Sequence, residues 1–164
     1  MTANTAWKTE RRFPITEVAP LLPHSGHMVL LDRVTACTPD SLSAEASVSD
    51  GHILLENGVL PCTMGMEIMA QGIGAFAGLR AEAAGEPVRL GYLLGTRKLN
   101  LFADHIPVGT KLVVDVRLSM EDSEGFGVFD CEMRWTDAPE AARAVLPPNG
   151  LLVQAALNVF SPKA

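Results

Sequence analysis

The sequence predicts an α+β fold in which an antiparallel β-sheet of about six strands wraps around one long, buried α-helix. Residues 60–79 form an apolar run that is broken only by Thr63, Glu67 and Gln71. Other segments alternate apolar and polar residues with the two-residue period of strands. Short turns between them favour antiparallel pairing, because parallel pairing needs long crossovers. A helix that is apolar on nearly every side must be covered, so we expect a second subunit to complete its burial.

The composition is typical of a single globular domain. The chain has 164 residues, of which 48% are hydrophobic and 20% charged, and this excludes a disordered chain. The formal net charge of −6 argues against a nucleic-acid-binding protein, which would carry a basic stripe. We expect residues 1–12 to form a flexible N-terminus without a signal peptide, and residues 13–164 to form one domain.

The cysteines indicate a reducing compartment. Cys37, Cys62 and Cys131 are widely spaced and form no Cys-x-x-Cys motif, so neither a disulfide framework nor a zinc site is predicted. His24 and His27 lie three residues apart, but they lack a third metal ligand at suitable spacing. We therefore expect a cytoplasmic protein that uses no metal or other cofactor.

The segments before the apolar run predict a short helical turn and two strands. Residues 13–23 have apolar residues spaced for one or two helical turns, which Pro20 and Pro23 close. Residues 28–34 favour a strand, and residues 41–48 alternate cleanly between two faces. The apolar face of the second strand carries Leu42, Ala44, Ala46 and Val48.

The apolar run predicts a helix over Met64–Ala84, after an irregular connection at residues 50–61. Thr63 can accept a hydrogen bond from the first turn, and Gly85 is a suitable C-cap. The run contains Glu67 and four glycines, which argue against a membrane-spanning helix. Each glycine inside the helix costs about 1 kcal/mol relative to alanine, so we expect close backbone packing to compensate. These glycines are Gly65, Gly72, Gly74 and Gly78.

The rest of the chain predicts four more strands. They lie at residues 88–102, 111–120, 126–135 and 151–160. Residues 105–109 are expected to form a turn, and residues 137–149 an Ala- and Pro-rich loop with room for one helical turn. In the second of these strands, alternation predicts one apolar face, which carries Leu112, Val114, Val116, Leu118 and Met120.

Glu67 is a candidate functional residue because a carboxylate on an apolar helix is unusual. Its neighbours Met66, Ile68 and Met69 offer no solvated surface, so we expect Glu67 to be buried and to be paired, protonated or in a cavity. Gln71 lies one turn further along the same helix face. The alternative is a helix-start carboxylate that the helix dipole favours.

Four stretches of the chain resemble a known family. They are residues 22–24 (Leu-Pro-His) with 30–33 (Leu-Leu-Asp-Arg), residues 60–61 (Leu-Pro) with 67–71 (Glu-Ile-Met-Ala-Gln), residues 93–97 (Leu-Leu-Gly-Thr-Arg), and residues 128–132 (Val-Phe-Asp-Cys-Glu) with 157–160 (Leu-Asn-Val-Phe). With the predicted architecture, the chain resembles the hotdog-fold 3-hydroxyacyl-acyl-carrier-protein dehydratases of fatty-acid synthesis. It resembles in particular the dehydratase-like branch found with aryl-polyene pathways.

The resemblance implies that Glu67 and a histidine share an elimination of water. In the family the histidine lies in a Gly-His-Phe-Pro-Gly loop, whereas residues 51–55 are Gly-His-Ile-Leu-Leu. His52 is one candidate, and His24 of the Pro-His pair is its rival. Each also has an alternative without a catalytic role, because His24 could stabilise a turn and His52 could be exposed in its loop. The family further implies a site at a dimer interface, where Glu67 of one subunit faces the histidine of the other.

The implied reaction is the syn elimination that converts a 3-hydroxyacyl thioester on acyl carrier protein into the trans-2-enoyl thioester. A neutral histidine suits the base for the Cα proton, and a carboxyl group in apolar surroundings can stay protonated and donate to the leaving hydroxyl. Backbone N–H groups of Cys62 and Thr63 would stabilise the thioester oxygen, and Gln71 is expected to line the same site. Arg97 could be solvated, or could meet a phosphopantetheine phosphate or the acidic carrier protein.

Two other functions are compatible with this fold and a helix carboxylate. One is a hotdog acyl thioesterase, which would release a free thiol. The other is a non-catalytic partner subunit of a dehydratase heterodimer, which would become active only on mixing. The sequence leaves open whether the dimer is formed by two identical subunits or with a paralogue.

Overall fold

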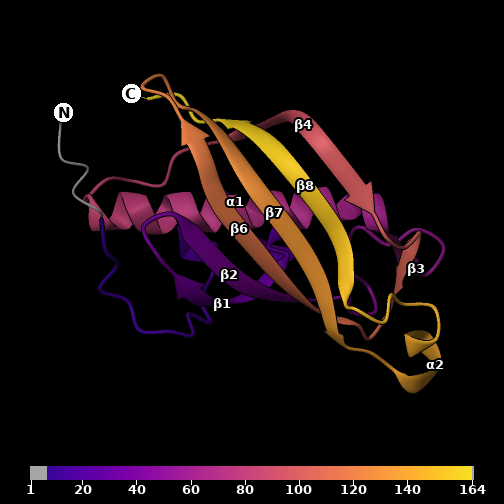
Figure 1. Ribbon diagram of the computed structural model, residues 1–164. Coiled ribbons are helices and arrows are strands. Elements are labelled where there is room, and N and C mark those ends of the chain that lie inside the picture. The colour runs from indigo at the N-terminus through magenta and orange to yellow at the C-terminus, as the bar shows by residue number, and fades with distance from the viewer. Residues whose placement is uncertain (1–6, 164) are drawn as a thin grey trace.

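Six strands form one antiparallel sheet, and a single long helix lies across one of its faces (Figure 1). The computed structural model describes residues 7–163. The strands follow in the order β1-β2-β6-β7-β8-β4, and each neighbouring pair is antiparallel. This arrangement confirms the predicted fold of a sheet wrapped around one helix.

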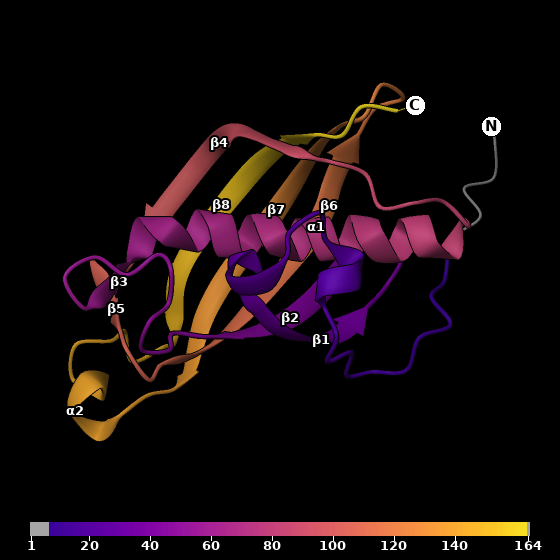
Figure 2. The same ribbon diagram turned by 180° about the vertical axis from the view of Figure 1, so that it is seen from behind.

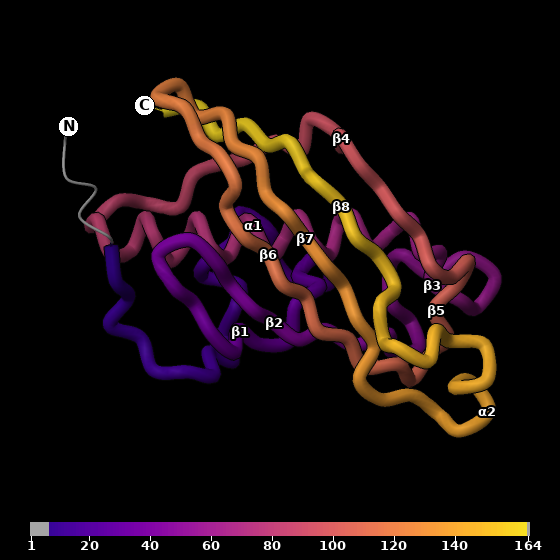
Figure 3. The backbone as a smooth tube through the Cα atoms, in the orientation of Figure 1, coloured from indigo at the N-terminus to yellow at the C-terminus, as the bar shows by residue number. Residues whose placement is uncertain are grey.

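The strands of the sheet lie near their predicted positions. Their bounds are β1 (Leu31–Cys37), β2 (Ser41–Ser47), β4 (Tyr92–Leu101), β6 (Lys111–Glu121), β7 (Phe126–Asp137) and β8 (Leu151–Phe160). The first strand begins later than residue 28, because residues 26–28 form a 3₁₀ turn. The fourth begins at Tyr92, later than the predicted residue 88. Figure 3 shows β4 at one edge of the sheet, beside β8.

Two short strands were not predicted from the sequence. Strands β3 (Val59–Pro61) and β5 (His105–Pro107) pair with each other in segments that we expected to be a connection and a turn. Helix α2 (Glu140–Arg143) is the one helical turn that was expected within the loop at residues 137–149. Elements of three or four residues are too short to establish a period in the sequence.

The long helix α1 (Gly65–Ala83) follows directly on a 3₁₀ turn, η3 (Cys62–Met64). Gly85 stands just beyond it with φ +69°, which confirms the predicted glycine at the C-terminal end. The predicted cap at Thr63 is wrong, because this residue lies inside η3 and neither helix start has a side-chain cap. Within residues 7–163, no helix has the length and hydropathy that a membrane crossing requires.

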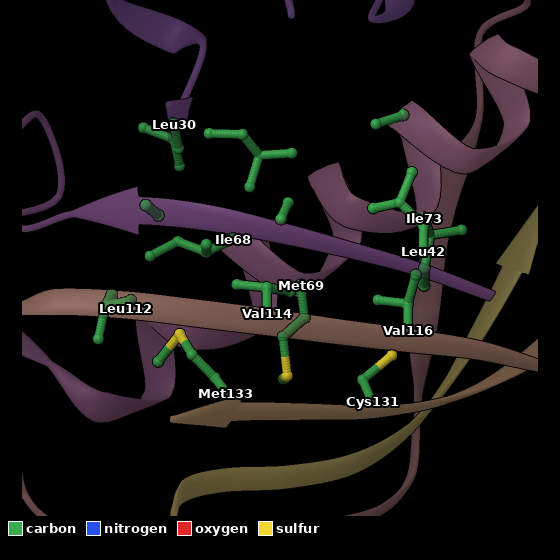
Figure 4. Close-up of a cluster of buried hydrophobic side chains, with 14 of the residues drawn as sticks. Leu30, Leu42, Ile68, Met69, Ile73, Leu112, Val114, Val116, Cys131 and Met133 are labelled. Carbon is green, nitrogen blue, oxygen red and sulfur yellow. The ribbon is translucent and has the colours of Figure 1, made fainter. Parts of the chain in front are cut away.

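One face of α1 packs against the apolar face of the sheet. In Figure 4, Ile68, Met69 and Ile73 of α1 lie among buried side chains of the strands β2, β6 and β7. These strand residues include Leu42, Leu112, Val114, Val116, Cys131 and Met133. The alternation predicted for β2 is confirmed, because Leu42, Ala44 and Ala46 are buried.

Met120 does not continue the apolar face of β6, as the alternation predicted. Its side chain is 46% exposed, whereas Val114 and Val116 are buried. The pairing of β6 with β7 shifts between Leu118 and Met120. An irregularity of one residue turns the following side chains to the other face, and alternation alone does not reveal where it occurs.

Two of the helix glycines face the sheet and let it approach closely. A Cβ atom on Gly65 would lie 2.8 Å from Cε of Met133, and one on Gly72 would lie 3.2 Å from Cγ1 of Val116. These separations are tighter than ordinary side-chain contacts. They confirm the expectation that close packing offsets the low helix propensity of these glycines.

The other two helix glycines meet a different segment, residues 18–30, which we call the strap. The strap lies in front of α1 in Figure 2, whereas the sheet lies behind the helix. It contains two 3₁₀ turns, η1 (Ala19–Leu21) and η2 (Gly26–Met28). The strap therefore covers part of the helix face that the sheet leaves open.

Contacts with Gly74 and Gly78 hold the first half of the strap against the helix. A Cβ atom on Gly78 would overlap the carbonyl oxygen of Leu21. A Cβ atom on Gly74 would lie 3.1 Å from Cδ2 of Leu22. Close packing thus compensates for all four glycines, but two of them face the strap instead of the sheet.

Part of the N-terminus that we expected to be flexible contacts the domain. The ring of Trp7 meets that of Phe76 edge-on, with 5.5 Å between centroids, and Arg11 Nε lies 2.9 Å from Oε1 of Glu82. Residues 1–6 lie outside the described residues. The described residues of this segment therefore join the C-terminal half of α1.

Candidate active site

Glu67 lies in the first turn of α1, and the imidazole of His24 in the strap lies beside it. The distance from Nε2 of His24 to Oε1 of Glu67 is 3.7 Å. This is longer than a hydrogen bond of about 2.7–3.2 Å, so the two groups are close but do not hydrogen-bond to each other. The side chains are 30% and 40% exposed, and a substrate can reach both. The two groups therefore form an open acid–base pair.

Two expectations about Glu67 need correction in the single chain. Its side chain is not buried, because α1 is only half-covered at Met66, Glu67 and Ala70. A histidine of the same chain already lies beside the carboxylate, whereas the resemblance implied a histidine from a partner subunit. The expected pairing of the carboxylate is present, and the helix dipole also favours a negative charge in the first turn.

Local backbone geometry places His24 at the turn of the strap. Leu22 is extended, as the residue before a proline usually is, and Pro23 prevents η1 from continuing. Gly26 has φ +58°, a left-handed conformation that glycine adopts readily, and the chain changes direction there. Nδ1 of His24 is buried and has no hydrogen-bond partner within residues 7–163.

The side chain of Gln71 hydrogen-bonds to the strap and does not face a substrate site. Its side chain is only 1% exposed. Nε2 donates to the carbonyl oxygen of Met28 at 2.6 Å, and Oε1 accepts from the N–H of Leu30 at 2.8 Å. The prediction that Gln71 lines the substrate site is therefore wrong in this chain. The four-residue spacing from Glu67 was the available signal, but the strap as its partner was not visible in sequence.

The helix start offers Thr63 but not Cys62 as an oxyanion donor. The N–H of Cys62 donates to the carbonyl oxygen of Asp104 at 3.0 Å, which corrects the expectation that it is free. The Cys62 side chain is buried, and burial raises the pKa of its thiol to about 11. Thr63 is exposed in the first turn, where backbone N–H groups lack intrahelical acceptors.

His52 is held by its own loop. Its Nδ1 accepts a hydrogen bond from the N–H of Leu54 at 3.2 Å, so the neutral ring carries its proton on Nε2. That Nε2 is buried and has no partner in the described part of the chain. Burial lowers the pKa of His52, and the negative charge of Asp32 opposes this shift. The ring is thus kept neutral.

The remaining candidates are exposed. Arg97 lies on β4, His27 lies in the strap, and His105 lies on β5. No group of three or more potential metal ligands occurs in residues 7–163. The nearby imidazole of His24 is the contact that marks Glu67 as part of a site.

A family model agrees with this geometry. The model of the ApeP-like family, described as ApeP dehydratase, matches residues 16–164. The chain belongs to the ApeP-like dehydratase family. This membership confirms the resemblance to hotdog dehydratases of the aryl-polyene branch, and with it dehydration in aryl-polyene-type synthesis. A comparison with curated proteins found no match.

Solved structures share the fold over nearly the whole chain. The dehydratase heterocomplex ApeI:P from Xenorhabdus doucetiae matches with 29% identity and a TM-score of 0.75, covering 93% of each chain. A mutant of the thioesterase PA1618 from Pseudomonas aeruginosa matches with 17% identity and a TM-score of 0.56, covering 96% of this chain and 99% of that one. AziG from S. sahachiroi matches with 14% identity and a TM-score of 0.55, covering 84% of this chain and 94% of that one. The last two likenesses concern the fold alone.

Proposed function

We propose that this ApeP-like dehydratase acts on a 3-hydroxyacyl thioester carried by acyl carrier protein and forms the trans-2-enoyl thioester. His24 is the base and Glu67 the acid. The observation that carries this proposal is the 3.7 Å separation of the two groups at the exposed start of α1. A second histidine, His52, donates a hydrogen bond if it enters the site, because its proton is on Nε2.

The geometry accounts for each proton in the reaction. Nε2 of neutral His24 takes the Cα proton, and the electron pair of that C–H bond forms the double bond to Cβ. The Cβ–O bond breaks, and the hydroxyl leaves as water with the proton of Glu67. The step leaves an imidazolium beside a carboxylate. Because these groups are 3.7 Å apart, a proton can return from His24 to Glu67 and reset the site.

The thioester oxygen gains negative charge while the Cα proton is removed. The first turn of the helix, at Thr63, supplies backbone N–H groups and the positive end of the helix dipole. Glu67 lies one turn further along the same helix, so the oxyanion and the leaving hydroxyl can be served from one element. We further propose that Arg97, exposed on β4, meets the phosphate of the carrier arm.

The experiment measures enoyl absorbance after the protein is mixed with 3-hydroxyacyl thioester. Glu67→Gln should lower kcat by about 10²- to 10⁴-fold, as expected for loss of a general acid. Glu82→Gln is the matched control, because Glu82 is an exposed carboxylate at the other end of α1. Full turnover by Glu67→Gln would refute the proposed role. Release of free thiol without an enoyl product would indicate the thioesterase alternative.

We also propose that a second hotdog subunit, in the cytoplasm, pairs with the β4 edge. This edge strand and the segment before it expose large apolar side chains. They are Val88, Leu90, Tyr92, Leu93 and Leu94. Such a patch is typical of a protein interface, and an unpaired edge strand is a template for another strand. The related ApeI:P structure is a dehydratase heterocomplex, which supports a paralogue as the partner.

The partner is tested by the mass of the particle and by mixing. The chain alone, and the chain mixed with a purified hotdog dehydratase, are compared by size-exclusion chromatography with light scattering. Leu94→Asp should dissociate the assembly, whereas Val145→Asp, at an exposed apolar residue beyond α2, should not. Turnover that appears only after mixing would identify the heterodimer as the active species.

A further inference from the structure

We propose that Gln71 is a positioning residue, which holds the strap in the register that sets His24 opposite Glu67. This inference rests on the proposed roles of His24 and Glu67 and adds a residue that touches neither substrate nor reacting atoms. It assigns a function to the amide one turn beyond the catalytic carboxylate.

The hydrogen bonds of Gln71 show that its amide belongs to the strap. A buried side-chain amide must find partners, because an unpaired polar group is costly away from water. Gln71 is 1% exposed, and its oxygen and nitrogen bond the backbone of Leu30 and Met28, at 2.8 and 2.6 Å. These two partners flank a single residue of the strap. The amide thus binds the backbone of the strap at one defined point.

Gln71 is one member of a row along α1 that follows the strap. Glu67, Gln71, Gly74 and Gly78 are spaced by four, three and four residues, and so lie on one helix face. Each contacts the strap. The carboxylate lies beside His24, the amide hydrogen-bonds to the strap backbone, and the two glycines pack against leucines of the strap. The helix face and the strap therefore match along their length.

The members of this row contribute differently to the register. The glycines determine how closely the strap approaches, but they make only van der Waals contacts, which are weakly directional. Hydrogen bonds require donor and acceptor at defined distances and angles. The two bonds of Gln71 are directional contacts of this row, and they lie four to six residues after His24 in the strap. Without them, His24 can shift relative to Glu67 while the leucines stay buried.

The activity test uses Gln71→Met, which keeps the length of the side chain and removes both hydrogen bonds. We expect kcat to fall about 10- to 100-fold, because a displacement near 1 Å can cost about 10²-fold, while KM changes less than about threefold. His24→Gln should cost much less in the Gln71→Met background than in wild type. Thr35→Val is the control, because it breaks a side-chain hydrogen bond to the backbone carbonyl of Ser43 between β1 and β2 and should leave kcat unchanged.

A second measurement does not depend on turnover. Nuclear Overhauser contacts between the ring of His24 and the side chain of Glu67 should be present in wild type and in Thr35→Val, and lost in Gln71→Met. Should the methionine variant fail to fold, Gln71→Leu removes both hydrogen bonds with a shorter apolar side chain. Unchanged Overhauser contacts in a folded Gln71 variant would overturn the inference. Inactive wild type with these contacts intact would instead count against the proposed function.

Discussion

Two loops of this chain carry a histidine, and they hold it in opposite ways. The strap presents His24 through contacts with α1, which is distant in sequence. The loop at residues 49–58 holds His52 through its own backbone, with bonds from the N–H of His52 to Ser49 and from the N–H of Leu55 to His52. The long-range contacts leave the His24 Nε2 facing a carboxylate, whereas the local contacts occupy Nδ1 of His52. What each ring nitrogen meets therefore decides which histidine can serve as a base.

The largest expected effect comes from replacing each of the two histidines in turn. His24→Gln should lower kcat by about 10²- to 10³-fold, because it removes the base beside Glu67. His52→Gln should lower kcat by less than about tenfold, because the neutral ring keeps its proton on Nε2 and cannot accept another there. Both variants are assayed by enoyl absorbance in the same assembly as wild type. The opposite order of effects would transfer the base role to His52.

A second prediction concerns how firmly the strap is held. Gly78→Ala should lower the free energy of unfolding by about 1–3 kcal/mol, because the new Cβ overlaps the carbonyl of Leu21 and backbone cannot yield easily. Gly74→Ala should cost less, because its Cβ meets only the end of the Leu22 side chain at 3.1 Å, and alanine favours the helix. Urea unfolding measures both. Equal losses of unfolding free energy in the two variants would mean that the strap backbone moves away freely, and the strap would then not be held by its contacts with α1.

The fold was predictable because its signals lie within single segments. The alternation of β2 and the apolar run of α1 were visible in sequence, and so was the need to compensate for helix glycines. Which neighbour each glycine meets was not predictable. Gly72 faces Val116 and Gly78 faces Leu21, and one of these partners follows the helix in the chain whereas the other precedes it.

The candidate site was predictable only in part, for the same reason. Glu67 stood out as a carboxylate on an apolar helix, and its spacing linked it to Gln71. The exposure of Glu67 depends on how far the strap covers the helix. The N–H of Cys62 is not available to a substrate because it bonds the carbonyl oxygen of Asp104, more than forty residues later in the chain. Contacts of this kind are tertiary and leave no local pattern.

The smallest expected effect is the pH dependence of stability at His52. Burial lowers the pKa of His52 in the folded state from its ordinary value of 6.5, so the unfolded chain binds a proton more readily. Its contribution to stability is therefore full above pH 6.5 and is lost as the pH falls below that value towards the folded pKa. Melting temperatures of wild type and His52→Gln between pH 8 and 5 measure this, and the wild type should lose more stability on acidification. Parallel curves would show that the ring is already solvated, and the contrast between the locally held histidine and the open His24 would then disappear.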